Sequence, residues 1–245
     1  MRFARLQTAD GIANAVASGD SWRHIEDPFA ETLEYTGEHT PTDDGMLLAP
    51  VRPRVIVGIA HNRGNNDHPL PIQAWHKSPH SVANPGEIIP VRRDIGTVNI
   101  EGELAVVIGR QSYQLTESNA FDHVFGYTVA NDVTNIDQVP KDEKNFQAKS
   151  GINYTPLGPW IETEIADPEN VATEVVINGR VVGQSGSFNL PSSVVASLVY
   201  VTSWLRLETG DVVLTGAPNT FFAAQPGDRV EITLAGIGTL TNTIG

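Results

Sequence analysis

Beyond about residue 50, the chain consists largely of short runs of strand-forming residues that end at glycine, proline or polar residues. The clearest runs are residues 54–59 (RVIVGI), 104–108 (LAVVI) and 125–130 (FGYTVA). Asn178-Gly179 separates two further runs, and this dipeptide is the strongest short-range signal for a β-hairpin. One helix is expected between Pro191 and Gly210, where apolar residues recur at helical spacing. The pattern predicts a mainly β (α+β) fold, with a mixed, largely antiparallel sheet folded into a sandwich or roll.

The first fifty residues are expected to form a small β/α unit. Residues 1–6 and 12–17 are predicted to be antiparallel strands joined by a turn at residues 8–11. Asp27-Pro28 is typical of a helix N-cap followed by proline, so a short helix is predicted to about Tyr35. Residues 37–53 are predicted to be a loop. The chain is therefore expected to divide into units at residues 1–50 and 51–245.

The formal net charge of −13 disfavours nucleic acids and anionic membranes as partners, since both need a basic surface. The chain has no cysteine, and its N-terminus lacks the apolar stretch of a signal peptide, so a cytoplasmic protein is expected. An acidic protein repels a small anionic substrate over long range. Such a ligand would have to be held by local positive charge: a metal ion, a lysine, an arginine or a helix N-terminus.

Three carboxylates lie at places where a strand would present them. Glu101 and Glu103 point to the same face of a predicted strand, and Asp132 follows the apolar run at residues 126–130. Magnesium and manganese prefer oxygen ligands of this kind. The alternatives are a solvated strand end at Glu101 and Glu103, and an ordinary Asn131-Asp132 turn. The residues alone leave both alternatives open.

Several segments, taken together and in order, resemble the fumarylacetoacetate hydrolase family. They are residues 101–109 (EGELAVVIG), 126–134 (GYTVANDVT), 137–138 (DQ), 149–150 (KS), 156–160 (PLGPW), 178–184 (NGRVVGQ), 210–218 (GDVVLTGAP), 226–228 (PGD) and 236–238 (GIG). The resemblance implies a mixed β-roll of that family's catalytic-domain type at residues 51–245, usually dimeric. It also implies a magnesium or manganese ion held by Glu101, Glu103 and Asp132.

The resemblance assigns further residues to the substrate. Lys149 is expected beside the metal, as a catalytic and substrate-binding group. Thr215 matches a position that holds the substrate carboxylate in the family. Gln138 and Tyr127 lie within the matched motifs and are also predicted to contact the substrate. Without the resemblance, an isolated lysine or a turn threonine would carry no such assignment.

The sequence departs from the family at two places. The family usually has a His-x-x-Glu pair on a loop that activates water, whereas neither His61 nor His68 has a glutamate three residues later. Either histidine could be the general base, with Asp67 as the nearby acid or a distant glutamate such as Glu87 in the vacant place. The family also often has an arginine where Ile136 stands, so a second pocket for a substrate carboxylate is in question.

The function expected from this resemblance is cleavage of a carbon–carbon bond in a small 2-oxo acid or diacid, through an enolate. Oxaloacetate decarboxylation and acylpyruvate hydrolysis are the leading reactions, and hydrolysis is expected to be the slower because the histidine–glutamate pair is absent. One alternative is an isomerase of the 2-hydroxyhepta-2,4-diene-1,7-dioate or 5-carboxymethyl-2-hydroxymuconate type. Another, from a different class, is a non-catalytic ligand-binding protein on the same scaffold.

Overall fold

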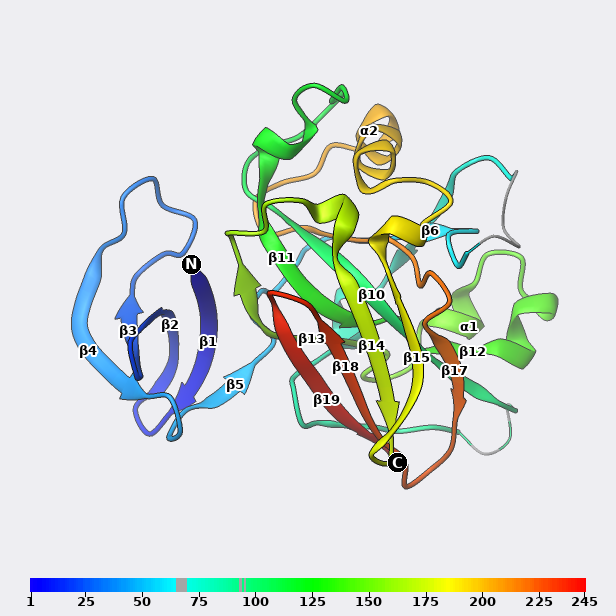
Figure 1. Cartoon of the computed structure of the whole chain (residues 1–245), viewed down its shortest axis with the longest axis horizontal. Coiled ribbons are helices and arrows are strands. Elements are labelled where there is room, and N and C mark those ends of the chain that lie inside the picture. Colours follow the sequence, from blue (N-terminus) through cyan, green and yellow to red (C-terminus); the bar gives the residue numbers. More distant parts are fainter. Residues whose placement is uncertain (65–69, 93, 95) are drawn as a thin grey trace.

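The structure is a computed structural model that describes residues 1–64, 70–92, 94 and 96–245. A 14-stranded mixed sheet runs through the whole molecule (Figure 1). Its main path, in spatial order, is β4 (Tyr35–Pro41), β3 (Ser21–Ile25), β2 (Gly11–Ser18), β1 (Arg2–Thr8), β13 (Thr155–Glu162), β11 (Val124–Asn131), β10 (Val98–Ile108), β16 (Val212–Leu214), β6 (Ile56–Ala60) and β7 (Gln73–Lys77). Four short strands pair off this path: β5 (Met46–Leu48), β8 (Val82–Ala83), β12 (Thr134–Asn135) and β17 (Phe221–Ala224).

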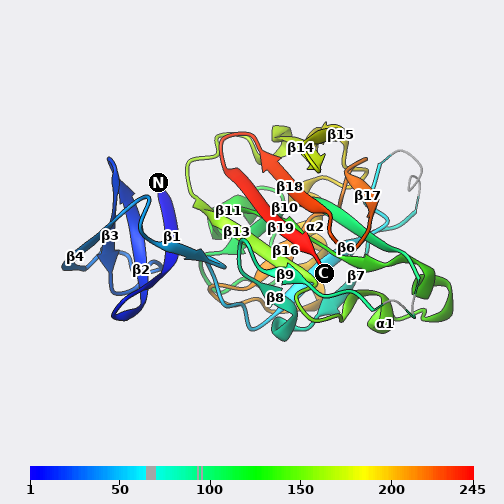
Figure 2. The ribbon, with the colours of Figure 1, turned by 90° about the horizontal axis from the view of Figure 1, so that it is seen from below.

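A second, 5-stranded sheet covers one face of the central part of the first (Figures 1 and 2). Its order is β15 (Arg180–Gly186), β14 (Ala172–Ile177), β18 (Arg229–Leu234), β19 (Gly238–Ile244) and β9 (Ile88–Ile89). The predicted hairpin is confirmed, because β14 and β15 pair Ile177 with Arg180 around Asn178-Gly179. Both turn residues have positive φ, 52° and 76°, as the two-residue turn requires. The prediction of a mainly β roll with few helices is also confirmed.

The long central strand β10 separates the apolar core from the site face. Its side chains alternate, and those in the core between the two sheets are Ile100, Leu104, Val106 and Ile108. The opposite face carries Glu101, Glu103, Ala105 and Val107. Gly102 allows the second sheet to approach, since a Cβ there would lie 3.0 Å from Ile232 and 3.2 Å from Val175. Packing of the two sheets therefore determines which face of β10 carries the carboxylates.

The N-terminal strands lie at one end of the molecule and join the main sheet where β1 pairs with β13 (Figures 1 and 2). The predicted helix after Asp27 is wrong, and the predicted loop at 37–53 contains most of β4 and all of β5. The Asp27 side chain accepts from the backbone N–H of Phe29 at 2.9 Å, which closes a turn instead of starting a helix. Phe29 then packs on Phe125, with ring centroids 4.6 Å apart. The first unit is thus β rather than β/α, and the boundary near residue 50 stays a prediction.

The predicted helix near the C-terminus is confirmed as α2 (Val194–Trp204), although it is shorter than the segment that suggested it. Ser193 caps it by accepting from the backbone N–H of Ala196 at 3.2 Å. The other α-helix of the described residues, α1 (Phe146–Lys149), is a single turn beside the site. Within the described ranges, no helix has the length and apolar character needed to cross a membrane.

Candidate active site

Glu101, Glu103 and Asp132 converge at one point, on the side of the main sheet that faces away from the second sheet. Glu101 and Glu103 come from β10, and Asp132 directly follows the last residue of β11, which pairs antiparallel with β10. One carboxylate oxygen from each residue lies within 4.8 Å of the other two. The three side chains are nearly inaccessible, with residue exposures of 3%, 2% and 0%. A buried cluster rules out the solvated strand end as the explanation for Glu101 and Glu103.

Hydrogen bonds fix the orientation of both glutamates. Thr134 donates to Glu101 Oε1 at 2.7 Å, and the backbone N–H of Gly216 donates to Glu103 Oε2 at 2.8 Å. Gly216 has a φ of +106°, and a Cβ there would lie 2.4 Å from the carbonyl oxygen of Asn62. Only glycine therefore fits where the backbone contacts Glu103.

Two buried lysines oppose the three carboxylates. Lys149 Nζ donates to Asp132 Oδ2 at 2.5 Å and to Glu101 Oε2 at 3.2 Å, and it lies 4.7 Å from the ring centroid of Trp75. Lys77 Nζ donates to the other oxygen of Asp132 and to the Tyr154 carbonyl oxygen at 2.8 Å. Asp132 is therefore held between two ammonium groups.

Lys77 was not recognised from the sequence. It ends β7, a strand whose sequence, QAWHK, has weak strand character. Within that strand Trp75 and Lys77 share a face, which gives one signal that both belong to the site. The isolated lysine gave no reason to expect burial, because lysine is almost never fully buried unless paired.

The charges of the cluster do not balance, and the pKa values reflect this. Burial, followed by repulsion from Asp132 and Glu101, raises the pKa of Glu103 well above its usual value. Burial also acts to raise the pKa of Asp132, but attraction to Lys149 and Lys77 outweighs it and lowers that pKa. The pKa of Lys149 is raised because the three carboxylates together outweigh the effect of burial. Burial lowers the pKa of Lys77.

A divalent cation fits this cluster. Three carboxylates against two ammonium groups leave a negative charge in a buried site, where an uncompensated charge is costly. The donor set consists of oxygen atoms, which magnesium and manganese prefer, and Glu103 has no ammonium partner among the described residues. A cation at this point would relieve the repulsion that raises the pKa of Glu103.

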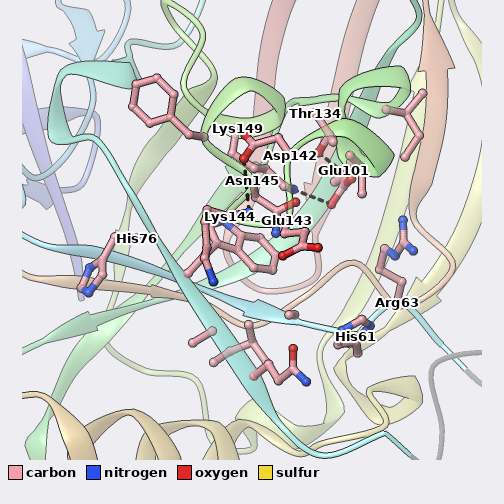
Figure 3. A pocket seen from close by; sticks show the side chains of 18 of the residues that line it. His61, Arg63, His76, Glu101, Thr134, Asp142, Glu143, Lys144, Asn145 and Lys149 are labelled. Carbon is pink, nitrogen blue, oxygen red and sulfur yellow. Dashed lines mark hydrogen bonds and ion pairs between the residues drawn. The ribbon is translucent and has the colours of Figure 1, made fainter.

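The cluster opens into a pocket of about 660 Å³ (Figure 3). Strand β6 and the residues after it form one wall, with His61 and Arg63. The segment that leads into α1 contributes Glu143 and Lys144 to the lining of the pocket. The remaining lining residues are Ile59, Ala60, Gln73, Ala74, Trp75, His76, Glu101, Glu103, Thr134, Ile136, Val139, Asp142, Asn145, Phe146 and Lys149.

The candidate bases differ in how the structure places them. His61 follows β6 with a φ of 56° and lines the pocket, whereas His68 and Asp67 lie outside the described residues. Glu87 does not take the vacant place beside His61. Its carboxylate accepts from the backbone and side-chain N–H groups of Asn84, at 3.0 and 2.7 Å, away from this pocket.

Three predicted substrate contacts lie elsewhere in the structure. The predicted substrate contact of Tyr127 is wrong. Tyr127 packs in the core between the sheets, because the odd-numbered residues of β11 point away from Glu103 and toward the second sheet. Gln138 lines a neighbouring pocket with Tyr154 and Ile152 instead of the pocket that holds the carboxylates. Thr215 is fully buried and donates to the Leu104 carbonyl oxygen at 2.9 Å, so its hydroxyl group does not line the pocket.

Comparison with known proteins agrees with this architecture. Residues 56–245 match the family described as "Fumarylacetoacetate (FAA) hydrolase C-terminal", and residues 1–50 match "Rv2993c-like, N-terminal". The chain is 33% identical to Protein Rv2993c of Mycobacterium tuberculosis, over 100% of this chain and 98% of the relative. It is 32% identical to oxaloacetate tautomerase YisK of Bacillus subtilis, over 73% of this chain and 62% of the relative. Among solved structures, 5-carboxymethyl-2-hydroxymuconate delta-isomerase from Mycobacterium smegmatis superimposes with a TM-score of 0.94 at 34% identity, covering 100% and 99% of the two chains.

Proposed function

Because the chain belongs to the fumarylacetoacetate hydrolase family, we propose that it is a divalent-metal-dependent enzyme that acts on small 2-oxo acids and diacids. The observation that carries this proposal is the buried cluster of Glu101, Glu103 and Asp132, with Lys149 beside it, at the end of an open pocket. Magnesium or manganese is the proposed ion, held by the three carboxylates. When bound, it would supply positive charge against the negative charge that develops on a substrate keto oxygen.

The residues of the chain have distinct roles in this proposal. Without a cation, attraction to the surrounding carboxylates outweighs burial and raises the pKa of Lys149, and its ammonium group can donate to a substrate oxygen that reaches the cluster. Lys77 is further from the pocket and holds Asp132 in place. Trp75 and the apolar residues of the wall line the pocket, where they would limit the access of water to the reacting carbon. An enolate of the substrate is the intermediate shared by decarboxylation, hydrolysis and tautomerisation.

Oxaloacetate turnover is expected to be faster than acylpyruvate hydrolysis. His61 lines the pocket without a glutamate three residues later, so the activation of water lacks the usual acid partner. General-base catalysis typically contributes about 10²–10⁴-fold, and only hydrolysis depends on it for water attack. The measurement compares magnesium-dependent rates on oxaloacetate and an acylpyruvate for wild type, His61→Ala and His68→Ala. The expectation would be contradicted if acylpyruvate hydrolysis is fast and either alanine variant abolishes it while the oxaloacetate rate stays unchanged.

An isomerase or tautomerase is the second candidate. The relatives favour it, since one is named an oxaloacetate tautomerase and a structural neighbour of 34% identity is named a delta-isomerase. Isomerisation and tautomerisation both need a proton to move between carbon and a base, but neither needs an attacking water. Proton NMR in deuterated buffer separates tautomerisation from decarboxylation, because the first exchanges the C3 hydrogens of oxaloacetate and the second releases pyruvate.

A ligand-binding protein without activity is the alternative from another class. It would hold a 2-oxo acid at the same cluster and release it unchanged. Metal-dependent turnover of any 2-oxo acid distinguishes the two, and a screen of oxaloacetate, acylpyruvates and hydroxymuconate-type acids with and without magnesium is the direct test. A cytoplasmic location also remains part of the proposal.

We propose a homodimer on the surface properties of α2. This helix contains no charged residue, although it lies on the outside of the molecule (Figure 1), and Trp204 at its end is 80% exposed. A helix that is apolar on all sides is normally covered. Sedimentation at micromolar concentration is expected to give twice the 26.4 kDa mass of the chain, and a 26.4 kDa species would contradict the proposal.

A further inference from the structure

We propose that Arg63 binds a second carboxylate of the substrate, so that the site prefers 2-oxo diacids to 2-oxo monoacids of the same length. The inference rests on the proposed function, since it assumes that the first carboxylate and the keto oxygen lie at the Glu101, Glu103 and Asp132 cluster. It adds a residue that determines specificity, on a wall of the pocket where the sequence predicted only a general base.

The pocket offers few cations that could meet a second carboxylate. Lys149 lies at the carboxylate cluster, where the first carboxylate and the keto oxygen are placed, and Lys77 does not line the pocket. Where a substrate-binding arginine would have been expected, Ile136 lines the pocket together with Val139, and these side chains offer no charge. The fully cationic side chains that remain among the described lining residues are Arg63 and Lys144. Arg63 is half-buried, whereas Lys144 is exposed on the segment before α1.

Packing holds Arg63 within the pocket wall. Its guanidinium carbon lies 5.1 Å from the ring centroid of Phe221, a cation–π arrangement. Its carbonyl oxygen accepts from the backbone N–H of Asn219 at 2.8 Å. Gly64, with a φ of +126°, packs against the Asn219 side chain, which a Cβ would approach to 2.5 Å. The Arg63 backbone is therefore tied to Asn219, and its side chain packs on Phe221.

The residue before Arg63 anchors the same segment to the body of the protein. Asn62 is fully buried and donates to the carbonyl oxygens of Ser192 and Thr215, at 2.9 and 2.7 Å. Its side-chain oxygen accepts from the backbone N–H of Ser192 at 2.7 Å. Because Gly216 follows Thr215 and contacts Glu103, this segment is connected through few bonds to the carboxylate cluster. The backbone at Arg63 is thus tied to the segment that contacts Glu103, and a recognition site for a diacid needs such a connection between its two ends.

The chemistry of arginine suits a carboxylate. A guanidinium presents five N–H donors in a planar fork that can bind a carboxylate through two parallel hydrogen bonds. Arg63 also takes part in a further interaction within the protein, and the five donors of a guanidinium can serve more than one acceptor. With a net charge of −13, the protein needs such a local cation to hold a dianion. Figure 3 shows Arg63 next to His61 at the margin of the pocket.

The test uses two pairs of ligands that differ only in the second carboxylate. Malate and 2-hydroxybutyrate are non-reacting, and calorimetry on the magnesium-loaded full chain measures their affinity. Oxaloacetate and 2-oxobutyrate are reacting, and C3 hydrogen exchange measures their kcat/KM. Arg63→Met keeps the packing on Phe221, and it is expected to weaken malate binding about 10- to 100-fold, the range for a hydrogen bond to a charged group. Arg63→Met should raise the KM for oxaloacetate by a similar factor. The affinity for 2-hydroxybutyrate and the kcat/KM for 2-oxobutyrate should stay within about threefold of the wild-type values.

Two matched variants control for charge and place. Arg110→Met removes an equal charge from an exposed position outside the pocket and is expected to change nothing. Lys144→Met removes the other pocket cation and is expected to have a smaller effect than Arg63→Met. Arg63→Lys keeps the charge and should recover part of the malate affinity, and it replaces Arg63→Met in the comparison if circular dichroism shows that Arg63→Met is unfolded.

Three results would overturn the inference. The first is that wild type binds malate no better than 2-hydroxybutyrate. The second is that Arg63→Met weakens the binding of both ligands equally. The third is that Lys144→Met, and not Arg63→Met, loses affinity for malate. Failure of the proposed function gives a different result, because wild type would then bind neither malate nor oxalate in a magnesium-dependent way and would turn over neither 2-oxo acid.

Discussion

Glu103→Gln is expected to reduce metal-dependent turnover of oxaloacetate by about 10³-fold or more, because the proposed cation loses a charged ligand and several kcal/mol of charge stabilisation. The same change should stabilise the metal-free protein at neutral pH. Burial and repulsion from Asp132 and Glu101 raise the pKa of Glu103, so the wild-type carboxylate destabilises the fold once it ionises. The amide removes that repulsion, and its oxygen can still accept from the Gly216 N–H.

The sign of the pH dependence follows from the raised pKa. In metal-free wild type, the native state holds the Glu103 proton to a higher pH than the unfolded state does, so stability falls as pH rises through that window. Below the pKa of the unfolded glutamate, about 4.3, the two proteins should unfold alike. Thermal unfolding from pH 4 to pH 8 measures this, with Glu117→Gln as an exposed control. A variant less stable than wild type at pH 7 without metal would contradict the account of the repulsion.

Asp132→Asn should behave in the opposite way. It leaves Lys77 and Lys149 without the carboxylate that they share, so the metal-free variant is expected to be less stable than wild type. Turnover should be lost as in Glu103→Gln. The two amide variants therefore separate the role in metal binding, which they share, from the role in folding, in which they differ.

Lys77→Met is expected to destabilise the protein by about 3 kcal/mol, toward the lower end of the range for breaking a buried ion pair. Lys77 is 3% exposed and contacts Asp132 and the Tyr154 carbonyl oxygen, and methionine can satisfy neither. Lys149 still pairs with Asp132, which limits the loss. Urea unfolding measures the change, with the exposed Lys141→Met as the matched control.

A double variant shows whether the loss comes from the unpaired charge. Lys77→Met combined with Asp132→Asn removes both partners, so its destabilisation should be smaller than the sum of the two single changes. Magnesium should stabilise the single Lys77→Met variant, because a cation replaces part of the missing positive charge. A Lys77→Met protein within about 0.5 kcal/mol of wild type would show that Lys77 does not support Asp132.

Local patterns predicted the parts of the fold that local geometry determines. The Asn178-Gly179 hairpin and the α2 helix follow from turn chemistry and helical spacing, and the structure contains both. Strand alternation placed Glu101 and Glu103 on one face. Their meeting with Asp132 depends on the pairing of β10 with β11, which the resemblance implied but the residues alone left open.

The predictions from the sequence fail where contacts with distant parts of the chain determine the local structure. The signals at Asp27-Pro28 favour a helix start, yet packing of Phe29 on Phe125, nearly a hundred residues away, accompanies a turn instead. Tyr127 was placed near the substrate because it lies in a matched motif, but the register of β11 turns it into the core. Lys77 and Arg63 escaped notice because their surroundings come from segments far away in the sequence.

The central claim is that Glu101, Glu103 and Asp132 hold one divalent ion that the reaction needs. Calorimetric titration of metal-stripped protein with manganese, alongside oxaloacetate turnover at each point, tests it most directly. We expect one ion per chain, turnover in proportion to occupancy, and no binding to a folded Glu101→Gln, Glu103→Gln, Asp132→Asn triple variant. Binding by the triple variant as tight as that of wild type, or full turnover by the metal-free protein, would contradict the claim.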